Sequence, residues 1–400
     1  MLPSDSSRFS YHLLKVIRGR LKQRKKELRP KTKKMKTNKI IPSHLLALAL
    51  FAGFLFLLSG CKKDEPQPNQ SYQELFWVTN KGSQMPVLMT GNKESASILL
   101  FIHGGPGESS IASTGVYTGN SPANLTDNFL LASWDQRYAG YSINPDPIDW
   151  STVNVDQYAE DCDRVIEQLK IRFSGKKIIL VAHSWGGAVL TKFISNPAYH
   201  DKYDGWVVAD GMVNGFELAC AMQSYSRQRC IELIAEGNVQ YVDTLAYLNS
   251  VVLDPVAYDK PTFLRLQMLA ISLIKPGQKP LDPVVLSRCA QLEKSVFPDS
   301  ADRIRRNNNV ESQANLDLFY NQVYFINSNA SYVNISKPGL IIWGENDCVV
   351  PTDAAYPFTG RLSSLGKTFQ FKLYPDCWHT PMFSNTQQYI DDIRKFIDGL

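Results

Sequence analysis

The residue with the strongest case for chemistry is Ser184, which lies in the segment AHSWGG (182–187). An apolar run, 177–183, comes before it, and a helical pattern follows. A serine at a sharp turn between a strand and a helix has its Oγ exposed at the edge of a sheet, as a nucleophile requires. Ala182 stands where the strict pattern has glycine, and it is the smallest departure from that pattern. We therefore predict that Ser184 is a nucleophile.

A glycine-rich loop follows another apolar run in FIHGGPG (101–107). Glycines leave backbone N–H groups accessible because no side chain shields them. The N–H groups of Gly104 and Gly105, together with that of Trp185, are predicted to form an oxyanion hole. A phosphate-binding loop is the rival interpretation, but the segment has neither a following Lys-Ser/Thr nor the spacing G-x-G-x-x-G.

His379 is the predicted general base. It lies after the apolar run 369–374 and before the last helical pattern of the chain. His103 and His183 lie inside the two motifs above, and we expect them to be structural loop residues. The order Ser…Asp…His along the chain also favours His379 as the base.

Asp347 is the predicted acid that orients the base. It comes three residues after the run GLIIWG (339–344), at the expected carboxyl end of a strand. A carboxylate there would orient His379 and stabilise the imidazolium that forms during the reaction. Asp376 and Asp353 are the alternatives, although Asp376 is too close to His379 in sequence to reach around it easily.

These residues need elements that carry them to one edge of a sheet. Short apolar runs alternate with helical patterns, which predicts an α/β protein with a mostly parallel central sheet flanked by helices. Apolar residues at helical spacing mark helices over 155–173 and 386–400. The predicted strands are 74–80, 85–91, 97–103, 129–135, 177–183, 205–210, 339–344 and 369–374, of which the first two form an antiparallel pair.

The alternation stops over 212–336. This stretch is helical in pattern, is rich in Met, Tyr and Gln, and separates two strands that would be neighbours in the sheet. The economical interpretation is a helical cap inserted into a core made of 73–211 and 337–400. A separate helical domain is the alternative.

The first sixty residues have the layout of a secretory signal peptide. A basic stretch precedes the 14 apolar residues 45–58, which are too few to span a bilayer comfortably. The run ends in LSGC (58–61), which resembles a bacterial lipobox, so Cys61 is the predicted lipidation site. A second methionine, Met35, indicates that 1–34 are a mis-assigned start.

Residues 61–72 would then form a short polar tether behind the lipid. Two or three acyl chains hold a protein stably on a membrane, which one chain does not. The sequence therefore predicts an exported protein of the bacterial cell envelope, anchored by lipid on the periplasmic side or at the cell surface.

The charge of the folding part argues against nucleic acid as a partner. Of 43 Lys and Arg and 38 Asp and Glu, residues 1–40 hold 14 and two, which leaves 29 basic and 36 acidic residues in 61–400. A net charge of −7 in that part gives no basis for binding a polyanion.

Six cysteines remain besides Cys61. Cys348 follows Asp347, and Cys377 lies two residues before His379, so their loops would bring the two thiols together. A disulfide between Cys348 and Cys377 is predicted, since an exported domain can form one. No metal-ligand spacing such as C-x-x-C occurs, and neither a metal nor another cofactor is expected.

Taken together, the motifs resemble the proline iminopeptidase family of α/β-hydrolases. The matching pieces are HGGPG (103–107), WDQR (134–137), SWGG (184–187) and GENDCVVP (344–351). The resemblance implies the α/β-hydrolase fold and cleavage of an N-terminal residue, often proline, from small peptides. Tyr138 departs from the family, which usually has glycine after the DQR triplet.

Relatives of this kind bind the substrate's free amine with acidic residues of the cap. The resemblance offers Glu217, Glu232 and Glu236 by location, beside the simpler interpretation that each is a solvated helix residue. Three hypotheses remain: an aminopeptidase of prolyl type, an ester or lactone hydrolase on the same triad, and a non-catalytic binding protein on a hydrolase scaffold. The oligomeric state is left open.

Overall fold

The computed structural model describes residues 72–119, 124–278 and 281–400. The expected signal segment, Cys61 and nearly all of the expected tether lie outside the described residues, so the predictions made for them stay predictions. Within the described ranges, no helix is both long enough and apolar enough to cross a membrane.

The strands form one eight-stranded sheet in the order β1-β2-β4-β3-β5-β6-β7-β8. The pairs β1–β2 and β2–β4 are antiparallel, and every later pair is parallel. The strands are β1 (Tyr72–Asn80), β2 (Ser83–Gly91), β3 (Ser97–Ile102), β4 (Leu130–Trp134), β5 (Lys177–His183), β6 (Gly205–Ala209), β7 (Gly339–Gly344) and β8 (Phe369–Tyr374).

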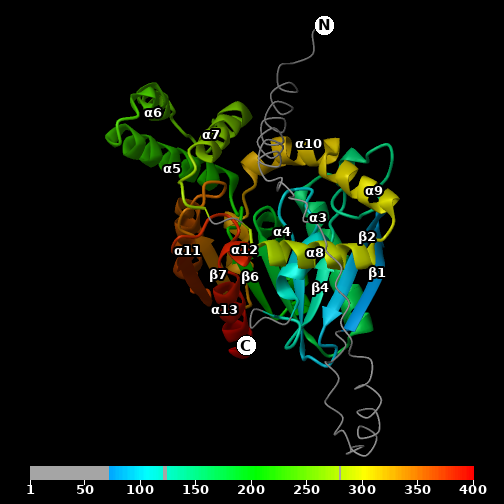
Figure 1. The fold of residues 1–400 in the computed structure, drawn as a ribbon. Coiled ribbons are helices and arrows are strands. Elements are labelled where there is room, and N and C mark those ends of the chain that lie inside the picture. Colours follow the sequence, from blue (N-terminus) through cyan, green and yellow to red (C-terminus); the bar gives the residue numbers. More distant parts are fainter. Residues whose placement is uncertain (1–71, 120–123, 279–280) are drawn as a thin grey trace, which may run out of the picture. The chain divides into compact units, whose positions relative to one another are not determined.

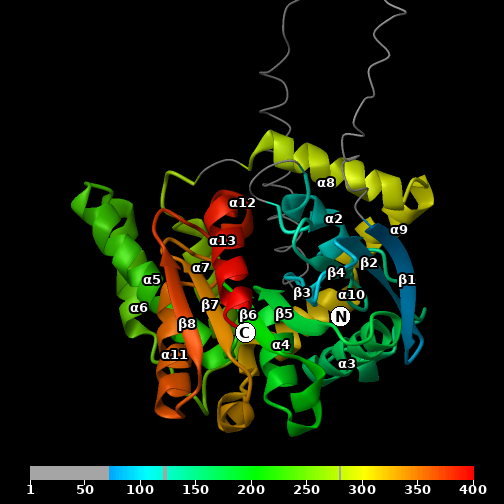
Figure 2. The same ribbon diagram turned by 90° about the horizontal axis from the view of Figure 1, so that it is seen from below.

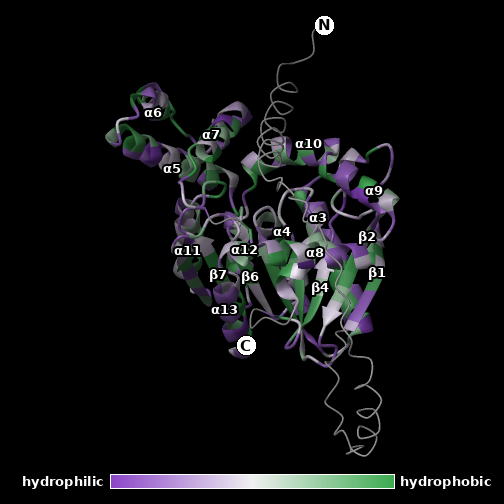
Figure 3. Cartoon of the chain, viewed as in Figure 1, coloured by the Kyte–Doolittle hydropathy of each residue, from purple (hydrophilic) through white to green (hydrophobic). Residues whose placement is uncertain are grey.

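The apolar runs become strands because both of their faces are buried. In β3, Ile98, Leu100 and Ile102 enter one hydrophobic core, and Leu99 and Phe101 enter the other. Successive side chains of a strand point to opposite faces, so a continuous apolar run supplies both cores at once. Figure 3 shows these inner strands as mostly hydrophobic and the outer helices with hydrophilic stretches. The predicted fold, a mostly parallel sheet flanked by helices, is confirmed.

Helices cover both faces of the sheet. Figure 2 shows α3, α4 and α11 on one face and α2, α12 and α13 on the other. The helices are α2 (Ser110–Ser113), α3 (Val155–Arg172), α4 (Gly186–Ile194), α5 (Gly215–Ala235), α6 (Val242–Ser250), α7 (Lys260–Ser272), α8 (Pro283–Val296), α9 (Ser300–Val310), α10 (Gln313–Gln322), α11 (Ala355–Ser364), α12 (Pro381–Ser384) and α13 (Thr386–Asp398). Helix α3 begins at the Asn154 cap, whose side chain accepts from the N–H of Gln157.

The six helices α5–α10 lie between β6 and β7 in the chain. They form two groups rather than one bundle. Figure 1 shows α5, α6 and α7 together on the side of β7 and α11, while α8, α9 and α10 lie on the side of β1, β2 and β4. Helix α8 packs against α2, and α5 packs against α6 and α7.

Candidate active site

The structure brings Ser184, His379 and Asp347 together at the carboxyl edge of the parallel strands. Ser184 follows β5, Asp347 follows β7, and His379 follows β8. The Oγ of Ser184 lies 3.0 Å from Nε2 of His379, and Nδ1 of His379 lies 2.8 Å from Oδ2 of Asp347. The two alternative acids, Asp376 and Asp353, are exposed at the surface. The geometry is that of a hydrogen-bonded chain from carboxylate to imidazole to hydroxyl.

The turn that carries Ser184 is strained and tightly packed. Ser184 has φ +52°, in the left-handed region that few residues with a side chain adopt. Its backbone N–H donates to the carbonyl of Ala209 (3.1 Å), and its carbonyl accepts from the N–H of Met212 (2.9 Å). These two hydrogen bonds stabilise the strained conformation. A Cβ on Gly186 would lie 2.1 Å from the carbonyl oxygen of Ile102, so only glycine lets helix α4 begin this close to β3.

Burial sets the charges of the base and its acid. Asp347 is fully buried, and burial raises the pKa of its carboxyl to about 8. The N–H groups of Val349 and Val350 donate to its Oδ1 and act in the opposite direction. Burial also lowers the pKa of His379 from its ordinary value. At neutral pH the imidazole is therefore uncharged and can accept the proton of Ser184.

A second buried carboxyl, Asp210, stands beside the acid. It follows β6, the strand next to β7, and its Oδ1 accepts from the N–H of Gly344 at 2.8 Å. Burial raises the pKa of Asp210 well above its usual range, and the neighbouring charge of Asp347 raises it further. Hydrogen bonding between the two carboxyls raises the pKa of Asp210 and lowers that of Asp347, so Asp210 keeps the proton of the pair and Asp347 is the carboxylate. Asp210 is not among the site residues predicted from the sequence, although it ends the predicted strand 205–210.

The predicted oxyanion loop lies against the nucleophile. A Cβ on Gly104 would lie 3.0 Å from the Cβ of Ser184. Gly105 has φ +111°, a conformation that favours glycine. In the described part of the chain, the backbone N–H groups of Gly105 and Trp185 have no hydrogen-bond acceptor. They remain available to a developing oxyanion.

Gln136 joins this loop to the nucleophile turn. Its backbone N–H donates to Nε2 of His103 (3.1 Å), and its Nε2 donates to the carbonyl of His103 (2.9 Å). Its Oε1 accepts from the indole N–H of Trp185 (3.0 Å). One fully buried side chain therefore fixes the distance between the two halves of the predicted oxyanion hole. In the sequence alone, the triplet that contains Gln136 indicates a family resemblance but no role for this side chain.

We expect Gln136→Leu to lower kcat by about 10- to 100-fold, because a small displacement of catalytic donors has effects of that order. KM for a small substrate should change much less, since the residue does not line the outer surface. Steady-state kinetics on the variant measures both constants. The conservative variant Gln136→Glu keeps the side-chain acceptor for Trp185 but loses the side-chain donor to the carbonyl of His103. If both variants were as active as wild type, Gln136 would not have this role.

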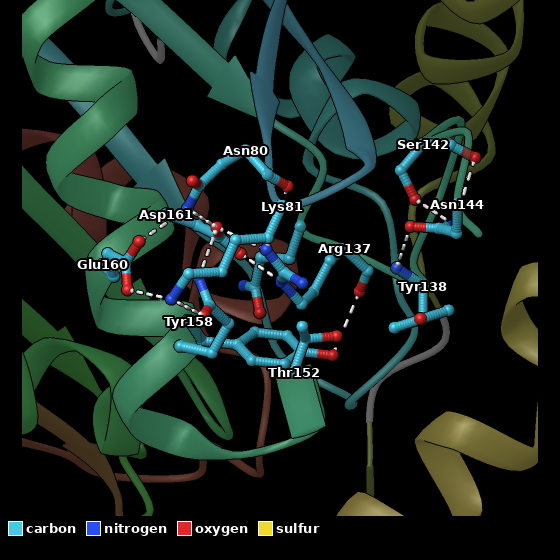
Figure 4. A network of polar contacts seen from close by, with 12 residues as sticks. Asn80, Lys81, Arg137, Tyr138, Ser142, Asn144, Thr152, Tyr158, Glu160 and Asp161 are labelled. Carbon is cyan, nitrogen blue, oxygen red and sulfur yellow. Dashed lines mark hydrogen bonds and ion pairs between the residues drawn. The ribbon is translucent and has the colours of Figure 1, made fainter. Parts of the chain in front are cut away.

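The two neighbours of Gln136 anchor the same region. Asp135 accepts from the Ser109 hydroxyl (2.8 Å), from the N–H of Ile111 (3.1 Å) and from the N–H of Tyr141 (2.9 Å). Arg137 forms an ion pair with Asp161 of α3, with 2.7 Å between the guanidinium NH2 group and Oδ1. Figure 4 shows Arg137 and Asp161 meeting near the turn after β1. The triplet therefore connects the sheet, the oxyanion loop and helix α3.

Residues 138–144 then contact the second group of inserted helices. Tyr138 has φ +54°, so the position where the family usually has glycine is indeed left-handed, and tyrosine occupies it here. Its carbonyl accepts from the side chain of Asn315 at 2.7 Å. Asn309 donates to the carbonyls of Gly140 (2.9 Å) and Ser142 (2.8 Å). The loop after the DQR triplet is thereby attached to α9 and α10.

The other histidines and the cysteine pair have structural surroundings. His183 donates from Nε2 to the carbonyl of His379 at 2.7 Å, which holds the loop of the base. The predicted disulfide between Cys348 and Cys377 is wrong, since the structure has both as thiols. The Sγ of Cys377 lies instead 3.3 Å from the hydroxyl of Ser384, the last residue of α12. The two loops do meet, since the N–H of Asn346 donates to the carbonyl of Cys377 at 2.8 Å, but they meet without a disulfide.

The three glutamates offered by the resemblance have other partners and neighbours in the structure. Glu217 accepts from Arg361 (3.0 Å) and from Asn329 (2.9 Å). Glu232 pairs with Arg229 on the same helix, and with Glu236 it lines a hollow of about 480 Å³. No residue of the triad or of the 103–108 loop lines that hollow. Among the described residues, no group of three or more His, Cys, Asp or Glu side chains could hold a metal ion.

Comparison with known proteins agrees with this fold. Residues 97–386 match the alpha/beta hydrolase fold family, and the chain belongs to that family. A stretch of 100 residues is 31% identical to a probable aminopeptidase, YbaC, of Bacillus subtilis (strain 168). The match covers 25% of this chain and 30% of that relative's length.

Two solved structures show the same fold at low identity. The proline iminopeptidase of Mycobacterium smegmatis aligns with a TM-score of 0.54 and 13% identity, over 82% of this chain and 98% of that one. A serine hydrolase involved in carbazole degradation, the CarC enzyme, aligns with a TM-score of 0.50 and 16% identity, over 82% of this chain and 100% of that one. At these identities the likeness shows the fold alone.

Proposed function

We propose that this chain is a serine hydrolase whose nucleophile is Ser184. The observation that carries the proposal is the hydrogen-bonded chain from Asp347 through His379 to Ser184, with contacts of 2.8 and 3.0 Å. In this mechanism Nε2 of His379 takes the hydroxyl proton as Oγ attacks the substrate carbonyl. The N–H groups of Gly105 and Trp185 stabilise the oxyanion, with Gly104 beside them. His379 then gives the proton to the leaving group, and water releases the acyl enzyme.

We propose further that the enzyme is an aminopeptidase that releases an N-terminal residue, of proline type, from small peptides. The motifs shared with proline iminopeptidases and the likeness to YbaC support this activity. The fold also serves other acyl-transfer chemistry, so ester or lactone hydrolysis on the same triad is the competing activity, and a small peptide or ester is the substrate in either case.

One assay separates the two activities. The purified chain should release the chromophore from prolyl or alanyl arylamides, and Ser184→Ala should lose at least about 10⁴-fold of that rate, as removal of a triad member does. Short acyl nitrophenyl esters are measured beside the arylamides. Hydrolysis of the esters alone would exclude the peptidase. A chain that hydrolyses neither and is not labelled by a fluorophosphonate would be a binding protein.

We also propose that the enzyme works outside the cytoplasm, held on a bacterial membrane by lipid on Cys61. The sequence of residues 45–61 supports this location. Mass spectrometry of the mature N-terminal peptide from cells should find an acylated Cys61, and Cys61→Ser should move the protein from the membrane fraction to the soluble fraction.

A further inference from the structure

Glu108 places a carboxylate at the nucleophile. It follows the HGGPG segment directly, and its side chain turns back over the loop. The Oε2 of Glu108 and the Cβ of Ser184 each lie 3.0 Å from the position that a Cβ on Gly104 would occupy, so the two atoms are at most 6.0 Å apart. Nδ1 of His183 lies 3.1 Å from the same position. The carboxylate is therefore beside the nucleophile and the oxyanion loop.

Among the described residues, this carboxylate has no counter-ion. Within residues 72–119, 124–278 and 281–400, no Lys, Arg or His forms an ion pair with Glu108, and no donor bonds its side chain. The residue is exposed, so a ligand can reach it. The negative charge of Glu108 also acts on the predicted base, because it raises the pKa of both His183 and His379. Burial lowers the same two pKa values.

A negative charge at this place works against a neutral substrate. The attack of Ser184 creates an oxyanion next to Gly104 and Gly105, and the Glu108 carboxylate repels it. A cation on the substrate removes the repulsion and gains an ion pair in the same event. The α-amine nitrogen of an amino-acyl group lies about 2.5 Å from its carbonyl carbon. An ammonium on an acyl group held at Ser184 is therefore within reach of Glu108, whose Oε2 is at most 6.0 Å from the Cβ of Ser184.

We propose that Glu108 is the subsite for a cationic amine of the substrate, adjacent to the scissile carbonyl. This inference rests on the proposed function and names the residue that would select for the free, protonated α-amine of its substrates. It places recognition of the amine on the oxyanion loop rather than on Glu217, Glu232 or Glu236 of the inserted helices.

The test compares two acyl groups that differ only in charge. Alanyl and isobutyryl p-nitroanilides are nearly isosteric, with an ammonium in the first and a methyl group in the second. Wild type should prefer the alanyl compound in kcat/KM. Glu108→Gln should reduce that preference on the order of 10-fold, the effect expected when a close charge pair is lost. Glu94→Gln, an exposed glutamate in the turn before β3, is the matched control and should leave the preference unchanged.

The outcomes separate this inference from the proposed activity. If wild type cleaves the alanyl anilide and Glu108→Gln keeps the full preference, the subsite is wrong and the peptidase stands. If neither anilide is cleaved, the peptidase is wrong, and the same acyl pair as p-nitrophenyl esters tests the subsite. A preference for the alanyl ester that Glu108→Gln removes supports it. Equal preference in both proteins, or no hydrolysis of either ester, overturns it.

Discussion

Asp347→Asn is expected to lower kcat by about 10⁴-fold while KM stays within a few-fold. The asparagine side chain no longer fixes His379 with its Nδ1 proton toward the acid, and it does not stabilise the imidazolium. The carboxylate is fully buried, so no water replaces its contact at 2.8 Å. Steady-state kinetics on the substrate found above measures both constants.

Asp210→Asn is the matched control, since it makes the same change in the neighbouring carboxyl. An asparagine amide has the shape of a protonated carboxyl and can still donate toward Asp347. Activity should therefore stay within about 10-fold of wild type. If Asp210→Asn lost as much kcat as Asp347→Asn, the acid that orients His379 would not be Asp347 alone.

The second large effect concerns stability. Arg137→Met is expected to lower the free energy of unfolding by about 3–5 kcal/mol, because it leaves the charge of Asp161 buried without its partner. Both side chains of this pair are 0% exposed. Urea unfolding followed by tryptophan fluorescence measures the change. The double variant Arg137→Met/Asp161→Leu removes both charges and should recover at least half of the loss.

An exposed pair on the same helix provides the control. Arg164 and Glu167 of α3 are 2.7 Å apart, with 47% and 38% of their side chains exposed. Because water screens such a pair, Arg164→Met should cost at most about 1 kcal/mol. A similar cost for Arg137→Met and Arg164→Met would show that burial does not strengthen the Arg137 contact.

The fold and the set Ser184, Asp347 and His379 could be predicted from the sequence because both depend on local patterns. The run 97–103 had to be buried on both faces, and the order of Ser184, Asp347 and His379 follows from the order of strands. All eight predicted strands occur in the structure. In each case the signal lies within a few residues of the element or side chain that it predicts.

The supporting contacts could not be predicted in the same way. Gln136 acts through His103 and Trp185, which are 33 and 49 residues away. Asp210 gains its importance from a strand more than a hundred residues later. The predicted disulfide failed for a related reason: the neighbours of a buried thiol are set by tertiary packing, which places Cys377 against Ser384. Such pairings are set by tertiary contacts, and local sequence patterns do not predict these contacts.

The attachment of 138–144 to α9 and α10 limits how this protein could be re-engineered. A lid that only covers a site can be exchanged between relatives to change the substrates accepted. Here the side chains of Asn309 and Asn315 hold a backbone segment that begins two residues after Gln136. A chimera that replaces this group of helices therefore needs the donor's 138–144 segment as well. Without that segment, the chimera would have a lower kcat as well as a changed choice of substrate.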